Sequence, residues 1–155
     1  MRKFLIFGTI AAAFVLLAGL VASAVAPKVA EPTRLHVVEH ATTDTVIDTD
    51  ASGDDTTGDL LTFANAVFDV SNTDQVGRDQ GDCIRINPAQ GTWECRWITW
   101  VGRGALTVEG PFYDTRDSVL AITGGTGAYR NARGTMLLQS RAGGTEFDFI
   151  FLILP

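Results

Sequence analysis

The part of the chain from residue 34 to residue 154 alternates short β-like runs with turn residues, and no segment keeps a 3.6-residue apolar period for long. Turn signals that recur every eight to twelve residues are typical of an antiparallel sandwich or barrel. Eight runs are interpreted as strands: 34–47, 60–70, 78–87, 92–101, 105–113, 118–123, 133–140 and 145–154. Eight antiparallel strands in short meanders close naturally into a barrel that can hold one small ligand. We therefore predict an all-β, eight-stranded antiparallel β-barrel.

A segment of a different kind precedes these runs. Arg2 and Lys3 are followed by an uncharged apolar stretch over residues 4–26, in which Ala-Ser-Ala at 22–24 offers a cleavage site. This is the layout of a secretory signal, although the stretch could also span a bilayer as an uncleaved anchor. We expect a secreted or extracytoplasmic barrel, with membrane contact only through an uncleaved N-terminal segment. The predicted divisions are a signal peptide or N-terminal membrane anchor, a linker and the barrel, at residues 1–26, 27–33 and 34–154.

The two cysteines, Cys83 and Cys95, flank the sequence IRINPAQGTWE. Its centre, NPAQG, is a turn signal between two β-like runs. On a hairpin folded about that turn, the cysteines would lie near the same rung, where opposed Cβ atoms are ~4.5–5.5 Å apart. We predict that an oxidising compartment joins them in a disulfide, with two buried free thiols as the alternative.

The charge of the chain argues against several partners. The formal net charge is −6, and loss of Arg2 and Lys3 with the signal would change it to −8. Without a basic patch we expect no nucleic-acid partner and no anionic membrane surface. The acidic run at 48–59 lacks the EF-hand pattern, so a solvated, mobile loop is favoured over a calcium site. His36 and His40 share a strand face but have no third histidine, and we expect no metal.

Residues 124–127, Gly-Gly-Thr-Gly, could suggest a phosphate-binding loop. A dinucleotide fingerprint needs G-x-G-x-x-G at the start of a helix, but Arg130 occupies the third glycine position and Gly134 interrupts the following segment. No Gly-Lys-Ser/Thr motif occurs either. We therefore predict a turn between two strands instead of a nucleotide site.

Two motifs carry a resemblance to a known family. VGRDQG at 76–81 and GGTGAYRNARG at 124–134 resemble the two most recognisable motifs of plant dirigent proteins, which share their barrel with the allene oxide cyclases. The resemblance covers about residues 34–154. It implies an exported, commonly trimeric, eight-stranded barrel with a hydrophobic cavity and no cofactor.

The resemblance also implies a function. Dirigent proteins steer the coupling of phenylpropanoid radicals, and allene oxide cyclases let a reactive epoxide close. Both act chiefly by restraining a bound apolar intermediate. The expectation is that this chain binds a small hydrophobic ligand or reactive intermediate and guides its cyclisation or coupling. A non-catalytic ligand-binding or scaffold barrel is the alternative.

The resemblance suggests particular site residues. Arg133 matches the arginine of the second motif, and the acidic residue of the first strand is Glu39, or His40 if the register slips by one. Facing inward, Arg133 and Glu39 would form a catalytic pair, with Glu39 a general acid of raised pKa, or would merely neutralise each other. The family's Asp after the glycines is Ala128 here and its middle-strand Tyr is Arg96, which counts against plant-type coupling. The residues predicted to bind the ligand are His40, Arg96, Trp97 and Tyr129.

The aromatic residues and the last run add two expectations. Trp93 and Trp97 share a face with Cys95, where core packing is the alternative to ligand stacking. In TEFDFIFLIL, at 145–154, the second half is apolar on both faces. We expect its outer face to be covered by the N-terminal segment or by a second protomer, and we favour an oligomer, a trimer by the resemblance.

Overall fold

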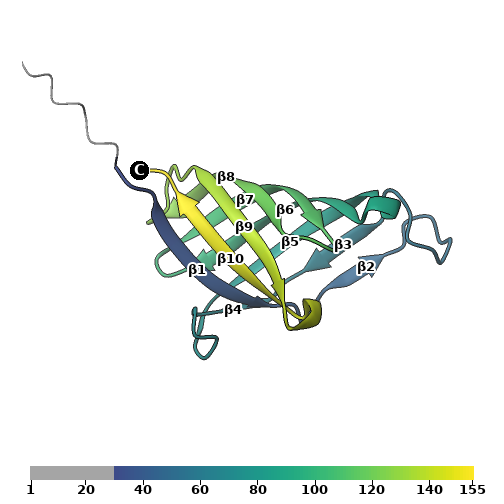
Figure 1. Cartoon of the computed structure of the whole chain (residues 1–155), viewed down its shortest axis with the longest axis horizontal. Helices are drawn as coiled ribbons and strands as arrows, with labels where there is room; N and C mark the ends of the chain where they lie inside the picture. The colour runs from purple at the N-terminus through teal and green to yellow at the C-terminus, as the bar shows by residue number, and fades with distance from the viewer. Residues whose placement is uncertain (1–29) are drawn as a thin grey trace, which may run out of the picture.

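A computed structural model describes residues 30–155 of this protein, so the predicted signal or anchor lies outside the described residues. The chain forms one antiparallel sheet that curls on itself (Figure 1). Its strands are β1 (Thr33–His40), β2 (Thr45–Ile47), β3 (Leu60–Phe63), β4 (Ala66–Phe68), β5 (Gln75–Asn87), β6 (Thr92–Val101), β7 (Gly104–Tyr113), β8 (Ser118–Gly127), β9 (Gly134–Arg141) and β10 (Glu146–Ile153). Two 3₁₀ turns, η1 (Pro88–Gln90) and η2 (Ala142–Gly144), connect β5 to β6 and β9 to β10. Within residues 30–155, no helix has the length and apolar character needed to cross a membrane.

The barrel has eight walls because two of them consist of two strands each. β3 and β4 pair with β5 in one continuous register from Leu60↔Ile84 to Val67↔Gly77. β1 and β2 pair with this wall on its other side, and a bulge at residues 41–44 separates them. Pairing of β1 with β10 and of β5 with β6 closes the sheet. Each wall contains one of the eight predicted runs, and the predicted eight-stranded antiparallel barrel is confirmed.

The glycine motif lies differently from the prediction. Gly124 to Gly127 are the last residues of strand β8 and pair with β7, so the turn starts only at Ala128. A Cβ atom on Gly125 would lie 2.4 Å from the carbonyl oxygen of Tyr129 and 2.7 Å from that of Ala105. The prediction that these glycines are the turn itself was wrong: they let the following turn fold closely against the strand.

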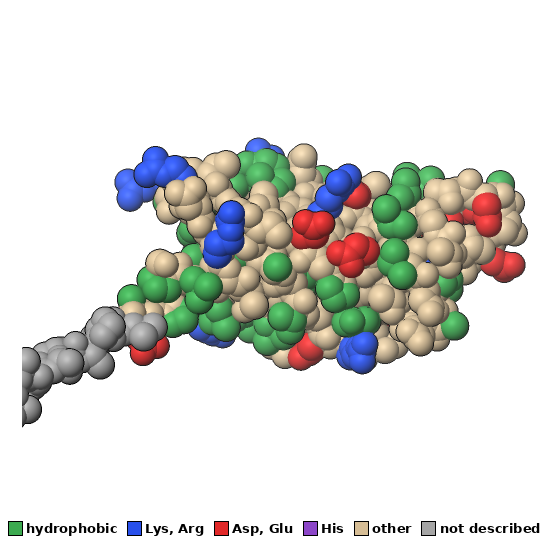
Figure 2. Space-filling view, turned by 90° about the horizontal axis from the view of Figure 1, so that it is seen from above, with side chains coloured by type: hydrophobic (Ala, Val, Ile, Leu, Met, Phe, Trp, Pro, Cys, Tyr) green, Lys and Arg blue, Asp and Glu red, His purple; other side chains and the backbone are tan. Residues whose placement is uncertain are grey.

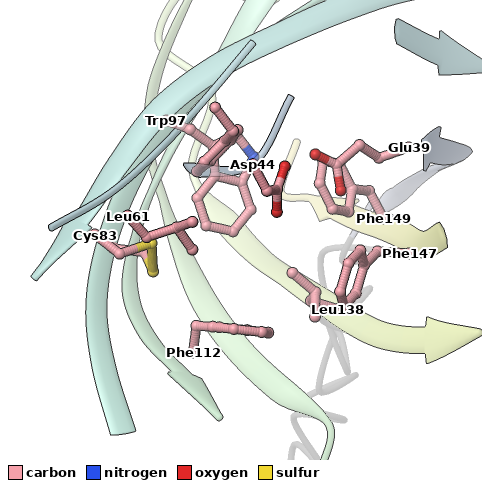
Figure 3. A pocket seen from close by; sticks show the side chains of 11 residues that line it. Glu39, Asp44, Leu61, Cys83, Trp97, Phe112, Leu138, Phe147 and Phe149 are labelled. Atoms are coloured by element: carbon pink, nitrogen blue, oxygen red, sulfur yellow. A yellow bond between two sulfur atoms is a disulfide. The ribbon is translucent and has the colours of Figure 1, made fainter. Parts of the chain in front are cut away.

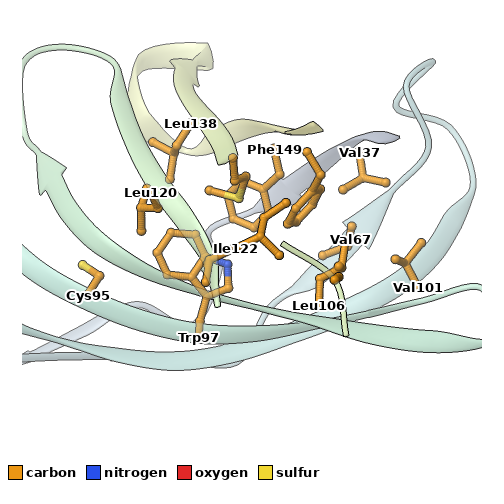
Figure 4. Packing of buried hydrophobic residues seen from close by; sticks show 14 of the residues in the cluster. Val37, Val67, Cys95, Trp97, Val101, Leu106, Leu120, Ile122, Leu138 and Phe149 are labelled. Atoms are coloured by element: carbon orange, nitrogen blue, oxygen red, sulfur yellow. The ribbon is translucent and has the colours of Figure 1, made fainter. Parts of the chain in front are cut away.

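One part of the barrel is filled by apolar side chains. Val37, Leu106, Ile122, Met136 and Phe151 are buried and pack into one cluster, part of which is shown in Figure 4. Tyr129 and Ala132, from the turn between β8 and β9, pack against the same cluster. The turn therefore closes this end of the barrel, and any space for a ligand must lie elsewhere.

The last strand keeps its predicted two faces. Phe149 and Phe151 are buried inside the barrel, whereas Leu152 on the outer face is 41% exposed and Leu154, just beyond the strand, is also exposed. Nothing in residues 30–155 covers these two leucines, so their cover by a second protomer or by the N-terminal segment stays a prediction.

Candidate active site

A cavity lies in the part of the barrel that the core cluster leaves open (Figure 3). The centres of water-sized spheres can occupy about 40 Å³ of it, and its empty space, open mouth included, is about 340 Å³. That is room for a few waters, or for a small organic molecule if the mouth takes part. Aromatic rings dominate its wall: Phe63, Trp97, Phe112, Phe147 and Phe149. Leu61, Leu138 and the two cysteines complete the apolar lining, and Glu39 and Asp44 are its charged residues.

The alternation of β1 decides which of two neighbouring residues reaches the cavity. Leu35 and Val37 pack on the core, so Glu39 also points inward and lines the cavity. His40 points outward, where its ring stacks on Phe68 with 4.0 Å between centroids and its Nε2 lies 2.7 Å from Asn72 Oδ1. Of the two sequence alternatives, the structure therefore places Glu39 at the cavity and His40 on the outer face, away from a ligand.

Asn65, between β3 and β4, connects the acidic groups. Its amide Nδ2 donates to Glu39 Oε1 at 2.7 Å and to Asp44 Oδ1 at 2.8 Å. Its Oδ1 accepts hydrogen bonds from the backbone N–H groups of Thr42 and Thr43 in the bulge between β1 and β2. Because both ends of the amide are occupied, Asn65 holds the two carboxyl groups in fixed positions. Sequence reasoning missed this residue.

Asp79 on β5 adds a third carboxyl group. Its Oδ1 accepts the backbone N–H of Asn65 at 3.1 Å, and the exposed fractions of Asp79 and Glu39 are only 2% and 4%. Burial, the largest cause, and the nearby Asp79 raise the pKa of Glu39 well above its usual value. Burial also raises the pKa of Asp79, to about 7. The two groups therefore hold a proton at pH values where a carboxyl group in water has lost it.

A hydrogen bond joins these two carboxyl groups. It raises the pKa of Glu39 and lowers that of Asp79, which makes Glu39 the donor and Asp79 the acceptor. Asp79 Oδ2 is buried and accepts no N–H or hydroxyl group of the described residues, so the proton of Glu39 is what satisfies it. Glu39 and Asp79 form an acid pair that shares a proton beside an apolar cavity.

Trp97 provides most of the aromatic wall. Its ring contacts Phe63 and Phe149, with centroids 5.9 Å and 5.5 Å apart. Its indole Nε1 is buried and donates to no acceptor in residues 30–155. A buried N–H without an acceptor is uncommon, and a bound molecule with an oxygen or nitrogen acceptor would satisfy it.

The predicted disulfide is present. Cys83 on β5 and Cys95 on β6 are directly opposed, with 4.0 Å between their Cα atoms. Both are buried and line the cavity, which the turn signal between them could not indicate. The disulfide thus fixes two strands of the cavity wall.

Three of the predicted site residues lie away from the cavity. Arg133 is exposed after the β8–β9 turn, and its carbonyl accepts the backbone N–H of Leu154. Since Thr33 pairs with Ile153 and Glu39 with Phe147, Arg133 lies near the start of β1 and Glu39 near its end. The predicted inward pair of Arg133 and Glu39 therefore does not form.

Arg96 and Tyr129 are likewise misplaced by the prediction. Arg96 lies between the inward-facing Cys95 and Trp97, so alternation turns it outward, where its side chain is 74% exposed and faces Asp82. Tyr129 packs at the closed end of the barrel. Of the residues predicted to bind a ligand, only Trp97 lines the cavity.

A second buried charge lies one rung beyond the disulfide. The Arg85 guanidinium bonds to Asp55 at 2.8 Å and to Asp114 at 2.7 Å, and it lies 3.8 Å from the centroid of the Trp93 ring. Asp55 belongs to the acidic run at 48–59, most of which is exposed as expected. Arg85 thus ties this run to the barrel, and its charge is neutralised by two carboxylates.

Comparison with known proteins identifies the class. Residues 28–152 match the family described as allene oxide cyclase, and the chain belongs to this family.

Several solved structures share the fold. A pyocyanin demethylase is 22% identical with a TM-score of 0.64, and the match covers 77% of this chain and 100% of that protein. The pterocarpan synthase dirigent protein GePTS1 is 19% identical with a TM-score of 0.61, over 76% and 82% of the two chains. A heme-binding cyclase that catalyses a [4 + 2] cycloaddition in neoabyssomicin biosynthesis is 14% identical with a TM-score of 0.58, over 80% and 64%.

Proposed function

We propose that this protein binds a small apolar molecule in the cavity and guides its ring closure or rearrangement by proton transfer, without a cofactor. The observation that carries the proposal is the buried, proton-sharing pair of Glu39 and Asp79 in an otherwise aromatic cavity. A barrel that served only as a scaffold would gain stability by replacing this pair with apolar side chains, because buried carboxyl groups are costly.

The geometry supports a simple sequence of proton movements. Glu39 gives its proton to an oxygen or nitrogen of the bound molecule, and the remaining negative charge is shared with Asp79. The free N–H of Trp97 donates to a ligand acceptor and fixes its orientation. The aromatic walls restrict the molecule to a folded shape in which ring closure is favoured, and the proton then returns to the carboxyl pair. Reactant and product are isomers, so no other reagent is consumed.

The family supports this proposal at the level of the class. Proteins with this barrel include a cyclase and a dirigent protein that is a pterocarpan synthase. At identities below a quarter, these structures share the fold with our chain, and their substrates are not carried over. Catalysis by shaping a bound intermediate is common to what the family name and these titles describe.

We also propose that the protein works outside the cytoplasm, as an oligomer. The disulfide between Cys83 and Cys95 favours an oxidising compartment. The exposed outer leucines Leu152 and Leu154 offer an apolar surface for a second copy.

The acid pair can be tested without knowing the natural substrate. A base removes the C3 proton of 5-nitrobenzisoxazole, the N–O bond breaks, and a coloured cyanophenolate is released. We expect the full chain to accelerate this ring opening as the pH rises through 7, when the carboxyl pair becomes a base. Glu39→Gln should lower the rate at least about tenfold, whereas Asp82→Asn, on the outer face of β5, should leave it unchanged.

Two results would count against the proposal. A Glu39→Gln variant as active as the wild type, with an unchanged circular dichroism spectrum, would show that the pair is not the base. Equal loss of rate in Glu39→Gln and Asp82→Asn would show that the reaction takes place on the surface.

A further inference from the structure

We infer that the molecule processed in this cavity is neutral when it binds and develops positive charge during the reaction, so that the cavity prefers cationic over anionic ligands. This inference rests on the proposed function and adds to it the chemical class of the substrate. The class is a small unsaturated or aromatic compound with an oxygen or nitrogen acceptor whose protonation leaves a cationic carbon skeleton.

The charged groups at the cavity are all acidic. Glu39 and Asp44 line it, and Asp79 is hydrogen-bonded to Glu39. The three carboxyl groups converge on Asn65, which donates through Nδ2 to Glu39 and Asp44 and through its backbone N–H to Asp79. In a wall of low polarity these charges act strongly on a bound molecule. An anionic ligand would meet repulsion there, and a cation attraction.

The basic residues are directed elsewhere. Residues 30–155 contain no lysine, and every arginine among them except Arg85 and Arg141 is exposed. Figure 2 shows basic side chains standing out from one face of the molecule. Arg85 is bound to two aspartates, and Arg141 lies on the outer face with Glu146 and Asp148. No cation of the described residues therefore reaches the cavity to hold a carboxylate or a phenolate.

The aromatic wall favours the same charge. The face of an aromatic ring attracts a cation, and tryptophan does so more strongly than phenylalanine. Trp97, with Phe63 and Phe149 against its ring, forms one side of the cavity. Phe112 and Phe147 contribute two further rings with their centroids 5.9 Å apart. Rings and carboxylates together surround a cation without basic competition.

The reaction balances in these terms. The proton of Glu39 forms a bond to an oxygen of the neutral substrate, and the carbon–oxygen bond breaks, which leaves positive charge on carbon and negative charge on the Glu39–Asp79 pair. A π bond of the substrate supplies the electrons of the new ring bond. Loss of a proton to the acid pair then restores both a neutral product and the protonated Glu39. A permanent cation mimics the charged intermediate and should bind more tightly than the substrate does.

A matched set of three bicyclic probes tests this preference: N-methylquinolinium, the neutral isostere 1-methylnaphthalene, and 1-naphthoate. Equilibrium dialysis against the full chain at pH 8 gives each dissociation constant. We expect the cation to bind at least tenfold more tightly than the neutral probe, and the anion at least tenfold more weakly. Asp44→Asn should reduce the preference for the cation several-fold without changing the affinity for the neutral probe, whereas Asp82→Asn should change neither.

The pH dependence gives a second readout. The titratable groups that face the ligand are Glu39, Asp44 and Asp79, and the two histidines lie on the outer face. The affinity for N-methylquinolinium should fall several-fold between pH 8 and pH 5.5, as the acid pair gains a proton, while that for 1-methylnaphthalene should not change.

The outcomes separate the two proposals. If the neutral probe binds and the cation binds no better, the charge preference is wrong but the cavity function stands. Tighter binding of 1-naphthoate than of the cation also overturns the charge preference. If none of the probes binds, the proposed function itself fails, and the inference fails with it.

Discussion

Asn65 is the residue that turns three separate carboxyl groups into one site. Glu39 could be predicted from its place in the first strand, because alternation and the family resemblance both point to it. Asp79 is part of the VGRDQG motif, but its inward orientation became visible only with the register of β5. Asn65 and Asp44 gave no signal in the sequence, since they meet Glu39 only through the bulge at residues 41–44.

Stability should depend on pH through Asp79. Because the pKa of Asp79 rises from 3.8 to about 7 on folding, the folded protein keeps a proton that the unfolded chain loses above about pH 4. Stability should therefore fall as pH rises from about 5 to about 7 and level off above, with Asp79 contributing roughly 2–4 kcal/mol. Asp79→Asn should flatten this slope, as measured by urea unfolding at pH 5, 6, 7 and 8.

The matched control for this measurement is Asp82→Asn, which changes a carboxyl group on the outer face of the same strand. It should keep the wild-type slope. A wild-type protein as stable at pH 8 as at pH 5 would contradict the buried acid pair.

At the scale of elements, the alternation of the strands was predictable and the ends of the strands were not. The predicted run 92–101 coincides with β6, and its inward residues Trp93, Cys95 and Trp97 follow from a period of two. The same period places Arg96 outside, which a motif alignment alone does not reveal. The glycines of 124–127 were assigned to a turn because glycine is common there, but close backbone approach is their actual role.

Adjacent glycines in this motif should differ in their tolerance. Gly125→Ala would bring a Cβ atom 2.4 Å from the backbone of Tyr129, so the turn must move, and we expect a loss of roughly 2 kcal/mol or more. Gly124→Ala meets only the hydroxyl of Thr107, at 3.1 Å, and should cost much less. Thermal unfolding of both variants checks this, and equal melting temperatures would be the contrary result.

The disulfide should stabilise the β5–β6 hairpin. Cys83 and Cys95 are 12 residues apart, and closing a loop of that size is worth ~3 kcal/mol. The double variant Cys83→Ala/Cys95→Ala should lose about this much stability in urea unfolding. Reduction of the wild type should produce a similar loss, and no change on reduction would speak against a stabilising bond.

At the scale of the molecule, the barrel and its strand order could be predicted, but the position of its cavity could not. Eight runs with turn signals and a short meander leave few other topologies. Which part of the interior stays open depends on how Val37, Met136 and Phe151 interlock at the closed end, and no sequence pattern specifies that. For this reason Arg133, at the closed end, was expected beside Glu39, near the open one.

The most direct test of the central claim asks whether the cavity holds a ligand. Leu138 lines the cavity from β9, whereas Val119 is exposed on the neighbouring strand β8. Leu138→Trp should fill the cavity, and Val119→Trp adds the same side chain on the outside. Binding of a neutral naphthalene dye, followed by its fluorescence, should be one-to-one for the wild type and for Val119→Trp. It should be at least tenfold weaker for Leu138→Trp. Equal binding by both variants would place the dye outside the barrel and contradict the cavity as the functional site.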